Sequence, residues 1–246
     1  MIRKLIYSLG IIALMGALLT PRVEAGLLQM RLTDNLGNSV TVVDNGAGDI
    51  QNTTTGLITF SGTLTGGSGA SPWLVNVTTG ISDPIFPASP GFAKMDLNSV
   101  NVSSTTSTGA TLLIELTYTG FPAFPSNGIL TGNIGGTTNG TLEAWGYKND
   151  SNIAFDTTNP EASVHHGPFS NAAFSSIVND GHGPINGLYS MTQVVYITHG
   201  AGVKSTSFDY ELVNAVPVPA GIVLLGMGAP LLGAGYWMRR RRVAVA

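Results

Sequence analysis

The sequence predicts an all-β body, an antiparallel β-sandwich or jelly roll, with a single transmembrane helix at its C-terminal end. Three observations lead to this prediction. Short runs of apolar and β-branched residues recur along the body, separated by Gly- and Asn-rich turns at a spacing of roughly ten residues. The body shows no convincing 3.6-residue hydrophobic period. A long uncharged apolar stretch near the C-terminus precedes a cluster of arginines.

The N-terminal residues have the pattern of a secretory signal peptide. A basic Arg3–Lys4 pair precedes the apolar run Leu5–Leu19, and a small-x-small cleavage pattern ends at Ala25. We therefore expect residues 1–25 to be removed by cleavage before Gly26. An uncleaved N-terminal anchor is the alternative, although the apolar run is short for a membrane span.

The body between the two ends is acidic and lacks cysteine. Its basic residues are Arg31, Lys94, Lys148 and Lys204, against 13 of the chain's 14 acidic residues, which gives a formal charge of −9. A body with this charge has no basic surface for nucleic acid, so we exclude nucleic acid as a partner. The absence of cysteine excludes disulfides, thiol nucleophiles and Cys-based metal sites.

The individual strands follow from alternation and from turn signals. In Ala110–Thr119 apolar and mostly polar residues alternate, as expected for a strand with one buried face. The runs expected to form strands are, in order, Leu27–Leu32, Ser39–Val43, Leu57–Thr65, Trp73–Thr78, Ala93–Val102, Ala110–Thr119, Ile129–Ile134, Thr141–Gly146, Ser190–Ile197 and Thr206–Val213. The segment Asn152–Gly187 is less patterned, and we expect long loops there with a short helix near Asn171–Ile177.

Histidines and Asx-rich bends are the residues that could hold a metal. His165, His166, His182 and His199 match no helical zinc motif, and solvated or hydrogen-bonded loop histidines are the more frequent interpretation. The bend Asp44–Asp49, like a second one at Lys148–Asn152, has oxygen ligands but lacks the bidentate Glu of an EF-type loop. Asx turns are the more frequent interpretation of both bends, because Asx side chains hydrogen-bond to their own backbone. We therefore predict neither a metal site nor a cofactor.

Two further groups of residues leave an enzymatic or sugar-binding role open. Glu115 and Glu143 lie on expected strands and could in principle pair as glycosidase carboxylates, although outward-facing strand acids explain them as well. Trp73, Trp145 and Tyr147 could stack on sugars, but core positions in a sandwich are the more frequent assignment. With no nucleophile–base motif in the chain, we predict no catalytic residues.

The C-terminus has three parts in a fixed order. The proline motif Val216–Ala220 comes first, and Ala220–Met238 would rise about 28 Å as a helix, close to the thickness of a bilayer core. The cluster Arg239, Arg240, Arg241 and Arg242 follows and should stay on the cytoplasmic side. We therefore expect a stop-transfer helix.

This order of motif, helix and arginines resembles the PEP-CTERM sorting domains of Gram-negative bacteria, in their Val-Pro-x-Pro-Ala variant. The resemblance implies recognition of Val216, Pro217, Pro219 and Ala220 by an exosortase-type membrane protease, with release toward the cell surface or extracellular matrix. The Pro-Glu-Pro form is absent and Pro230 interrupts the helix, which leaves the particular processing enzyme open.

The sequence thus predicts a signal peptide (residues 1–25), an exported β-sandwich body (26–215) and a sorting domain (216–242). The expected role is structural or adhesive, at the cell surface or in the matrix after transient anchoring in the inner membrane. Extracellular polysaccharide is a further possible partner. A carbohydrate- or calcium-binding sandwich is the first alternative, and a secreted hydrolase is the weaker one.

Overall fold

The computed structural model describes residues 26–170 and 172–217, and within them the chain forms strands and no helix. The strands are β1 (Leu27–Asp34), β2 (Ser39–Val43), β3 (Leu57–Gly62), β4 (Trp73–Ile81), β5 (Phe92–Thr106), β6 (Ala110–Phe121), β7 (Gly128–Thr138), β8 (Thr141–Asn149), β9 (Ala162–Ser170), β10 (Ala173–His182), β11 (Tyr189–His199) and β12 (Gly202–Ala215). All ten runs expected from the sequence are confirmed as strands, and the body is all-β.

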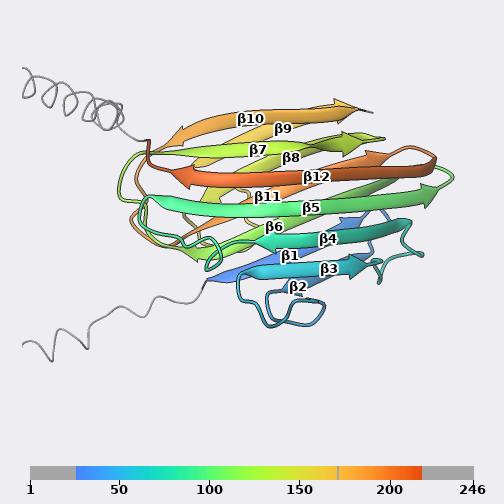
Figure 1. Ribbon diagram of the computed structural model, residues 1–246, viewed down its shortest axis with the longest axis horizontal. Helices are drawn as coiled ribbons and strands as arrows, with labels where there is room; N and C mark the ends of the chain where they lie inside the picture. Colours follow the sequence, from blue (N-terminus) through green and yellow to red (C-terminus); the bar gives the residue numbers. More distant parts are fainter. Residues whose placement is uncertain (1–25, 171, 218–246) are drawn as a thin grey trace, which may run out of the picture.

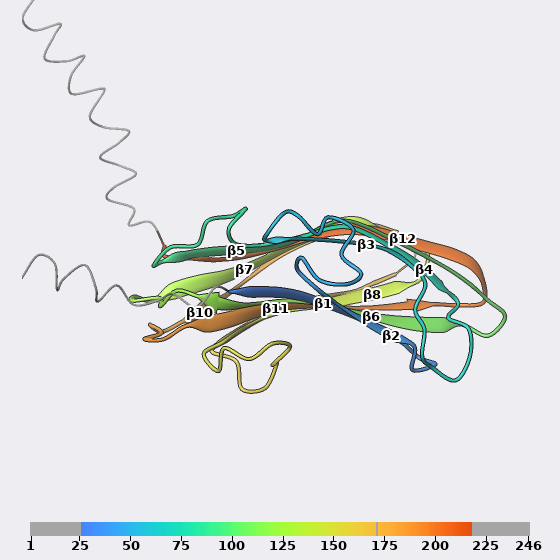
Figure 2. The same ribbon diagram turned by 90° about the horizontal axis from the view of Figure 1, so that it is seen from below.

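The strands form two six-stranded sheets that lie face to face (Figures 1 and 2). Sheet A has the order β2-β1-β6-β11-β8-β9, and sheet B has the order β10-β7-β12-β5-β4-β3. Every pairing within the two sheets is antiparallel. The body is therefore an antiparallel β-sandwich, as predicted.

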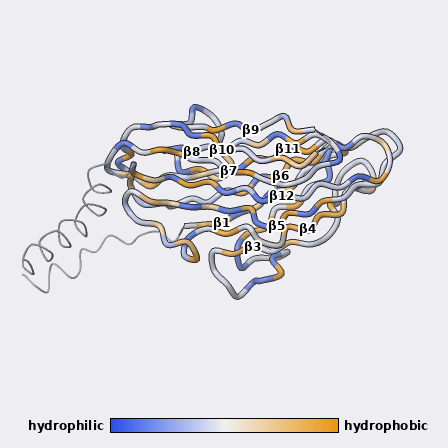
Figure 3. Tube along the Cα trace, turned by 45° about the horizontal axis from the view of Figure 1, so that its top comes forward, coloured by the Kyte–Doolittle hydropathy of each residue, from blue (hydrophilic) through white to orange (hydrophobic). Residues whose placement is uncertain are grey.

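The core lies between the sheets and follows from the alternation of the strands. Leu112, Ile114 and Leu116 on β6 are fully buried, and Leu97 on β5 and Leu212 on β12 are buried in the opposite sheet. Figure 3 shows this alternation as hydrophobic and hydrophilic positions that follow one another along the strands. Because successive side chains point to opposite faces, each sheet also presents an outer face to solvent.

The expectation of long loops in Asn152–Gly187 is confirmed for residues 152–161 and wrong for residues 162–170 and 173–182, which are strands, and the helix expected near Asn171–Ile177 is absent from the described residues there. This segment contains the hairpin β9–β10, which joins the two sheets along one edge of the sandwich: β9 pairs with β8, and β10 pairs with β7. Apolar and polar residues come in pairs along β10 (Ala-Phe, Ser-Ser, Ile-Val, Asn-Asp), so the period-2 pattern of a half-buried strand is missing. Pairing with β7 along ten residue pairs determines its conformation instead.

The described part of the chain begins and ends at the same end of the sandwich. Leu27 pairs with Thr119 at the end of β6, and the backbone N–H of Val216 donates to the carbonyl of Gly91 just before β5 (3.0 Å). Val216, Pro217 and Gly26 are described. The other residues expected to act in sorting or cleavage, Ala25, Pro219, Ala220 and Arg239 to Arg242, lie outside the described residues. Within the described ranges, no helix of membrane-spanning length and apolarity occurs.

Candidate functional site

A row of side chains crosses the outer face of sheet A. The register places His165 opposite Trp145, Trp145 opposite Val194, Val194 opposite Glu115, and Glu115 opposite Arg31. These residues come from β9, β8, β11, β6 and β1 and share one face because each is the direct cross-strand neighbour of the next. The row is aromatic at one end and charged at the other.

The aromatic end is a group of rings that we call the aromatic platform (Trp145, Tyr147, His165 and Tyr196). The Trp145 and His165 rings stack with centroids 4.9 Å apart and planes within 9° of each other. Tyr147 lies two residues beyond Trp145 on the same face of β8, and Tyr196, 42% exposed, stands on the adjacent strand β11. Strand geometry puts Tyr147 about 7 Å from Trp145 along β8. The platform therefore offers several adjacent rings to solvent.

A carboxylate lies beside these rings. Glu143 is directly opposite Tyr196 in the register, and its Oε2 is 3.4 Å from Nε2 of His165. The Glu143 and His165 side chains are both well exposed. Rings of this kind can stack on the apolar face of a ligand, and a carboxylate beside them can accept hydrogen bonds from its hydroxyls.

The charged end of the row is closed to ligands. Nε and Nη2 of Arg31 donate to the Glu115 carboxylate at 2.5 and 2.8 Å, and Phe155 covers the guanidinium with its ring centroid 4.4 Å away. The hydrogen bond to buried Glu115 raises the pKa of Arg31. A bidentate pair of this kind neutralises both charges, so this end offers no free cation for an anionic ligand.

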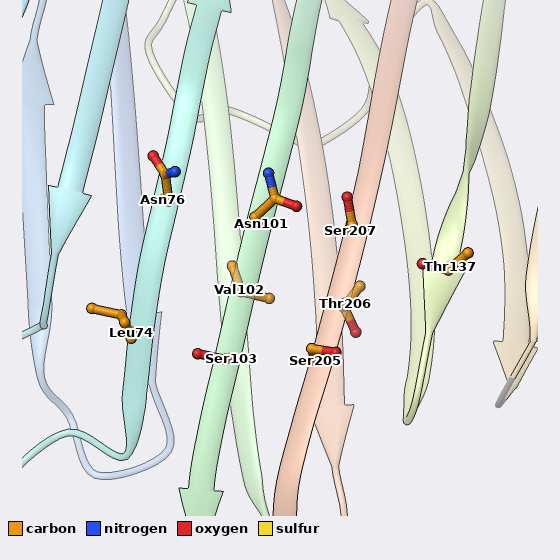
Figure 4. A pocket seen from close by; sticks show the side chains of 9 residues that line it. All are labelled: Leu74, Asn76, Asn101, Val102, Ser103, Thr137, Ser205, Thr206 and Ser207. Carbon is orange, nitrogen blue, oxygen red and sulfur yellow. The ribbon is translucent and has the colours of Figure 1, made fainter.

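The outer face of sheet B is different in kind. A shallow hollow of about 280 Å³ lies over β4, β5, β12 and β7. Figure 4 shows the side chains that line it. The residues that line it are Leu74, Asn76, Asn101, Val102, Ser103, Thr137, Ser205, Thr206 and Ser207. Most of them carry small hydroxyl or amide groups, and none carries an aromatic ring.

A second hollow on the same sheet is acidic. Asp96, Asp209 and Glu211 help to line it, and its volume is about 320 Å³. Burial, together with the nearby Glu211 and Asp209, raises the pKa of Asp96 to about 6 even though Lys94 opposes the shift. Lys94 pairs with Glu211 at 2.6 Å. Within the described ranges, no three His, Asp or Glu side chains converge in a way that would hold a metal ion.

Three of the four histidines lie between the sheets, so their assignment to loops is wrong. His199, at the end of β11, contacts the hydroxyls of Ser104 and Thr206 on sheet B, each at 2.8 Å. His166 Nδ1 lies 3.0 Å from the hydroxyl of Ser176. Burial lowers the pKa of both His166 and His199 to about 4. The imidazole rings of His166 and His199 are therefore uncharged at neutral pH and hydrogen-bond to hydroxyl groups between the two sheets.

The third inward histidine, His182, belongs to a buried polar cluster at one end of the sandwich. The two ring nitrogens of His182 lie 2.7 and 3.0 Å from Nζ of Lys148, and its Nε2 is 2.7 Å from Oδ1 of Asn214. The ammonium also lies about 5 Å from the rings of Phe124 and Tyr189. Burial lowers the pKa of Lys148 to about 8. The cluster is enclosed, so it does not form a surface site.

Other residues singled out in the sequence have structural positions. Trp73 is a core residue that packs against His199 with the two rings tilted by 36°, and it donates through Nε1 to the carbonyl of Thr111 (3.0 Å). Glu115 and Glu143 share the outer face of sheet A, but β11 separates their strands and each has its own partner. The two carboxylates are not a directly facing pair.

The first Asx-rich bend is held by hydrogen bonds of the kind that Asx turns make. The Asp49 carboxylate accepts the backbone N–H groups of Asn45, Gln51 and Thr59. In the second bend, Asn149 Oδ1 accepts the N–H of Ser151 (2.9 Å).

The sequence identified Trp145 and Tyr147 but missed His165 and Tyr196 as their neighbours. His165 was missed because β9 was taken for a loop. Tyr196 lies in an expected strand, and its outward position could have been found from the alternation with the buried Val195 and Ile197. That Tyr196 lies beside β8 depends on the strand order, which local patterns do not contain.

No protein-family model and no curated protein sequence matches the chain. Among solved structures it is similar to the carbohydrate-binding module TmCBM61, determined with β-1,4-galactotriose, at 12% identity over 58% of this chain and 88% of that one, with a TM-score of 0.29. It is also similar to the carbohydrate-binding module CBM6cm-2 from Cellvibrio mixtus lichenase 5A, determined with cellotriose, at 12% identity over 67% and 90% of the two chains, with a TM-score of 0.25.

A third similar structure is the enzymatically active domain of tailspike protein 4 of bacteriophage CBA120, at 14% identity and a TM-score of 0.30. The match covers 57% of this chain but only 19% of the tailspike chain.

Proposed function

We propose that this chain is an exported cell-envelope or matrix protein whose β-sandwich binds extracellular polysaccharide through the aromatic platform. The observation that carries the proposal is the Trp145–His165 stack on the outer face of sheet A, with Glu143 in contact with His165. Adjacent, partly exposed rings on a sheet face form an apolar patch of the kind that marks ligand-binding surfaces. Attachment to polysaccharide would give the protein a structural or adhesive role.

We propose that the aromatic platform binds polysaccharide and does not hydrolyse it. Of the two strand glutamates, Glu115 is buried and held by both nitrogen donors of Arg31, so it is not available as a nucleophile or base. Glu143 remains exposed beside the rings and is suited to accept hydrogen bonds from sugar hydroxyls.

The proposal also includes the route to the surface. The signal peptide pattern and the order of proline motif, apolar stretch and arginines support export followed by processing by an exosortase-type protease. Within the described residues, Val216 is the last one with a backbone hydrogen bond to the body, so the motif begins directly at the edge of the fold.

The binding claim is tested by affinity electrophoresis of the exported body through gels that contain neutral polysaccharides. We expect retardation of the wild type by at least one β-linked polysaccharide, and loss of that retardation in Trp145→Ala. Leu74→Ala is the matched control, because it removes a 56% exposed apolar side chain from the outer face of the other sheet. Equal retardation of Trp145→Ala and the wild type would rule out the platform as the site.

The sorting claim is tested separately by mass spectrometry of the surface form. We expect a C-terminus near Ala220 and no peptide from Gly221 onward. Surface material that retains Arg239–Ala246 would contradict processing and favour a permanent tail anchor.

A further inference from the structure

One loop covers part of the outer face of sheet A, next to the aromatic platform. Residues 150–161 connect β8 to β9 and project on the outer side of this sheet, as the loop below β11 in Figure 2 shows. The backbone N–H of Phe155 donates to Oγ1 of Thr117 (3.4 Å), and Asn152 Oδ1 accepts the N–H of Gly120 (2.7 Å). Phe155 also covers Arg31 on β1. The loop therefore crosses the face from β8 to β1.

The loop adopts an unfavourable backbone conformation at three positions. Asn152, Phe155 and Asn159 have φ values of 52°, 59° and 48°, in the left-handed region that residues with a side chain rarely adopt. For a bulky residue such as Phe155 this conformation is a clear outlier. Strain of this kind persists only where the surroundings enforce it, and it is concentrated at ligand-binding and catalytic sites.

Hydrogen bonds within the loop hold this conformation. Asp156 accepts the hydroxyl of Ser151 (2.8 Å) and both the N–H and the hydroxyl of Thr158 (2.9 and 2.6 Å). Asn149 Nδ2 donates to the carbonyl of Thr158 (2.8 Å), and the N–H of Glu161 donates to the carbonyl of Lys148 (3.0 Å). The loop is thus a fixed structure before any ligand arrives.

Its position closes one end of the platform. Tyr147 and Thr117 both pair with Thr192 of β11, so the loop residue that contacts Thr117 lies over the same row of the sheet as Tyr147. In the other direction along β8 the face passes Trp145 and Glu143 and reaches exposed Thr141. At that end the connections of β8 and β11 are short, residues 139–140 and 200–201. The platform is therefore bounded by the loop on one side and open on the other.

The charges around the platform indicate the kind of chain that fits. Of the four basic residues of the body, Arg31 is held by Glu115, Lys148 is buried, and Lys94 lies on sheet B. The fourth, Lys204, is on β12 of sheet B. Acidic side chains, by contrast, lie at the platform and in the loop. A uronic or sulfated polymer would be repelled, whereas a neutral one would not.

We infer that the platform receives the end of a neutral polysaccharide chain, which lies along β8 over Trp145 and stops against the loop 150–161. This inference rests on the proposed function and makes it more specific. An internal stretch of a polysaccharide would have to pass through the space that the loop 150–161 fills where it contacts Thr117 and Arg31. A chain end requires only the open side, and the ordered loop supplies a preformed surface for its terminal residue.

The test uses mixed-linkage β-glucan and β-1,4-galactan, each intact and after partial acid hydrolysis, at equal mass. At concentrations below saturation, bound protein is proportional to the number of sites. Hydrolysis that makes chains tenfold shorter should therefore raise binding about tenfold. Binding that is unchanged or reduced by hydrolysis, but still lost in Trp145→Ala, would overturn chain-end recognition and leave the proposed function intact.

A loop variant separates the loop's role from that of the rings. Phe155→Gly permits the left-handed backbone and removes the ring that anchors the loop to Arg31. We expect it to lose the preference for hydrolysed over intact polymer, and Ile50→Ala, an exposed change in a different loop, to keep it. A preserved preference in Phe155→Gly would contradict the role of the loop. Binding by neither wild type nor variants to any neutral polymer would instead count against the proposed function.

Borohydride reduction of the hydrolysed chains identifies the end that is bound. Reduction opens the reducing-end ring and leaves the other end unchanged. Loss of binding assigns the reducing end, and retained binding assigns the non-reducing end. An equal affinity for uronic acid polymers would contradict the restriction to neutral chains.

Discussion

The two outer faces of the sandwich are built by the same rule and have different surfaces. On sheet A the outward positions of β8, β9 and β11 hold Trp145, His165 and Tyr196, and a loop lies over the neighbouring strands. On sheet B the corresponding hollow is lined mainly by Ser, Thr and Asn, as Figure 4 shows. Alternation determines which residues face outward on both sheets, and only the identity of those residues distinguishes a platform from a plain surface.

The two outer faces also differ in how completely their charged side chains are paired. On sheet A, Arg31 and Glu115 form a bidentate pair beneath Phe155. On sheet B, Asp96 has a raised pKa because it is buried near two further carboxylates. Sheet A therefore presents rings with a neutralised ion pair, and sheet B presents small polar groups with incompletely balanced acids. This contrast favours sheet A as the side that binds a ligand.

The largest expected effect is the loss of stability in acid. Protonation of His166 and His199 would disrupt their contacts between the two sheets, and both outer faces depend on the packing of these sheets. His166 and His199 have pKa values of about 4 when folded and about 6.5 when unfolded. The unfolded chain therefore binds more protons between pH 6.5 and 4, and stability is lost as the pH falls through this range. Each ring contributes about 3 kcal/mol, and Asp96, with its pKa raised to about 6, offsets part of the loss.

Urea unfolding at pH 7 and pH 4.5 measures this effect. We expect His166→Gln to reduce the difference in unfolding free energy between the two pH values by about 2 kcal/mol. His165→Gln, on the outer face of the same strand, removes only the smaller charge repulsion that helps to lower the pKa of His166, so it should reduce the difference less than His166→Gln does. If the unfolding free energies at pH 7 and pH 4.5 differ as much in His166→Gln as in the wild type, His166 does not contribute to the acid transition.

The next effect compares the two ion pairs. Arg31→Ala leaves Glu115 buried without its partner, so we expect a loss of about 2 kcal/mol of unfolding free energy, moderated by the partial exposure of Arg31. Lys94→Ala leaves Glu211, which is more exposed than Glu115, without its partner and should cost less than about 1 kcal/mol. Urea midpoints at pH 7 measure both changes. Equal losses of unfolding free energy in Arg31→Ala and Lys94→Ala would contradict the view that the ion pair on sheet A is the more tightly held of the two.

The sequence predicted the body well because its signals are local. Alternation in Ala110–Thr119 and turn residues between the runs located ten strands. The edge hairpin β9–β10 was missed because its short polar residues carry little hydrophobic pattern and its conformation depends on pairing with β7 and β8. For the same reason the platform was found only in part: Trp145 and Tyr147 belong to one run, whereas His165 and Tyr196 reach them through cross-strand pairing.

A smaller effect concerns Asp96 on sheet B. Its pKa is about 6 when folded and about 3.8 when unfolded, so the stability it contributes is full below about pH 4 and is lost as the pH rises through 6. Asp96→Asn removes the buried charge and should raise the unfolding free energy by about 1–2 kcal/mol at pH 7.5, with no gain at pH 4. Urea unfolding at both pH values measures it. A gain of the same size at pH 4 would show that packing, and not charge, accounts for the change.

The smallest effect tests how far the platform extends from Trp145. Tyr196 stands across the strand from Glu143, so a sugar chain along β8 would meet its ring at the open side. Tyr196→Ala should weaken binding to the retained polysaccharide by about three- to tenfold, the contribution of one partly exposed ring. Ser207→Ala, which lies in the hollow of sheet B in Figure 4, should leave binding unchanged. Quantitative affinity electrophoresis measures both, and weaker binding in Ser207→Ala than in Tyr196→Ala would move the site to the other face.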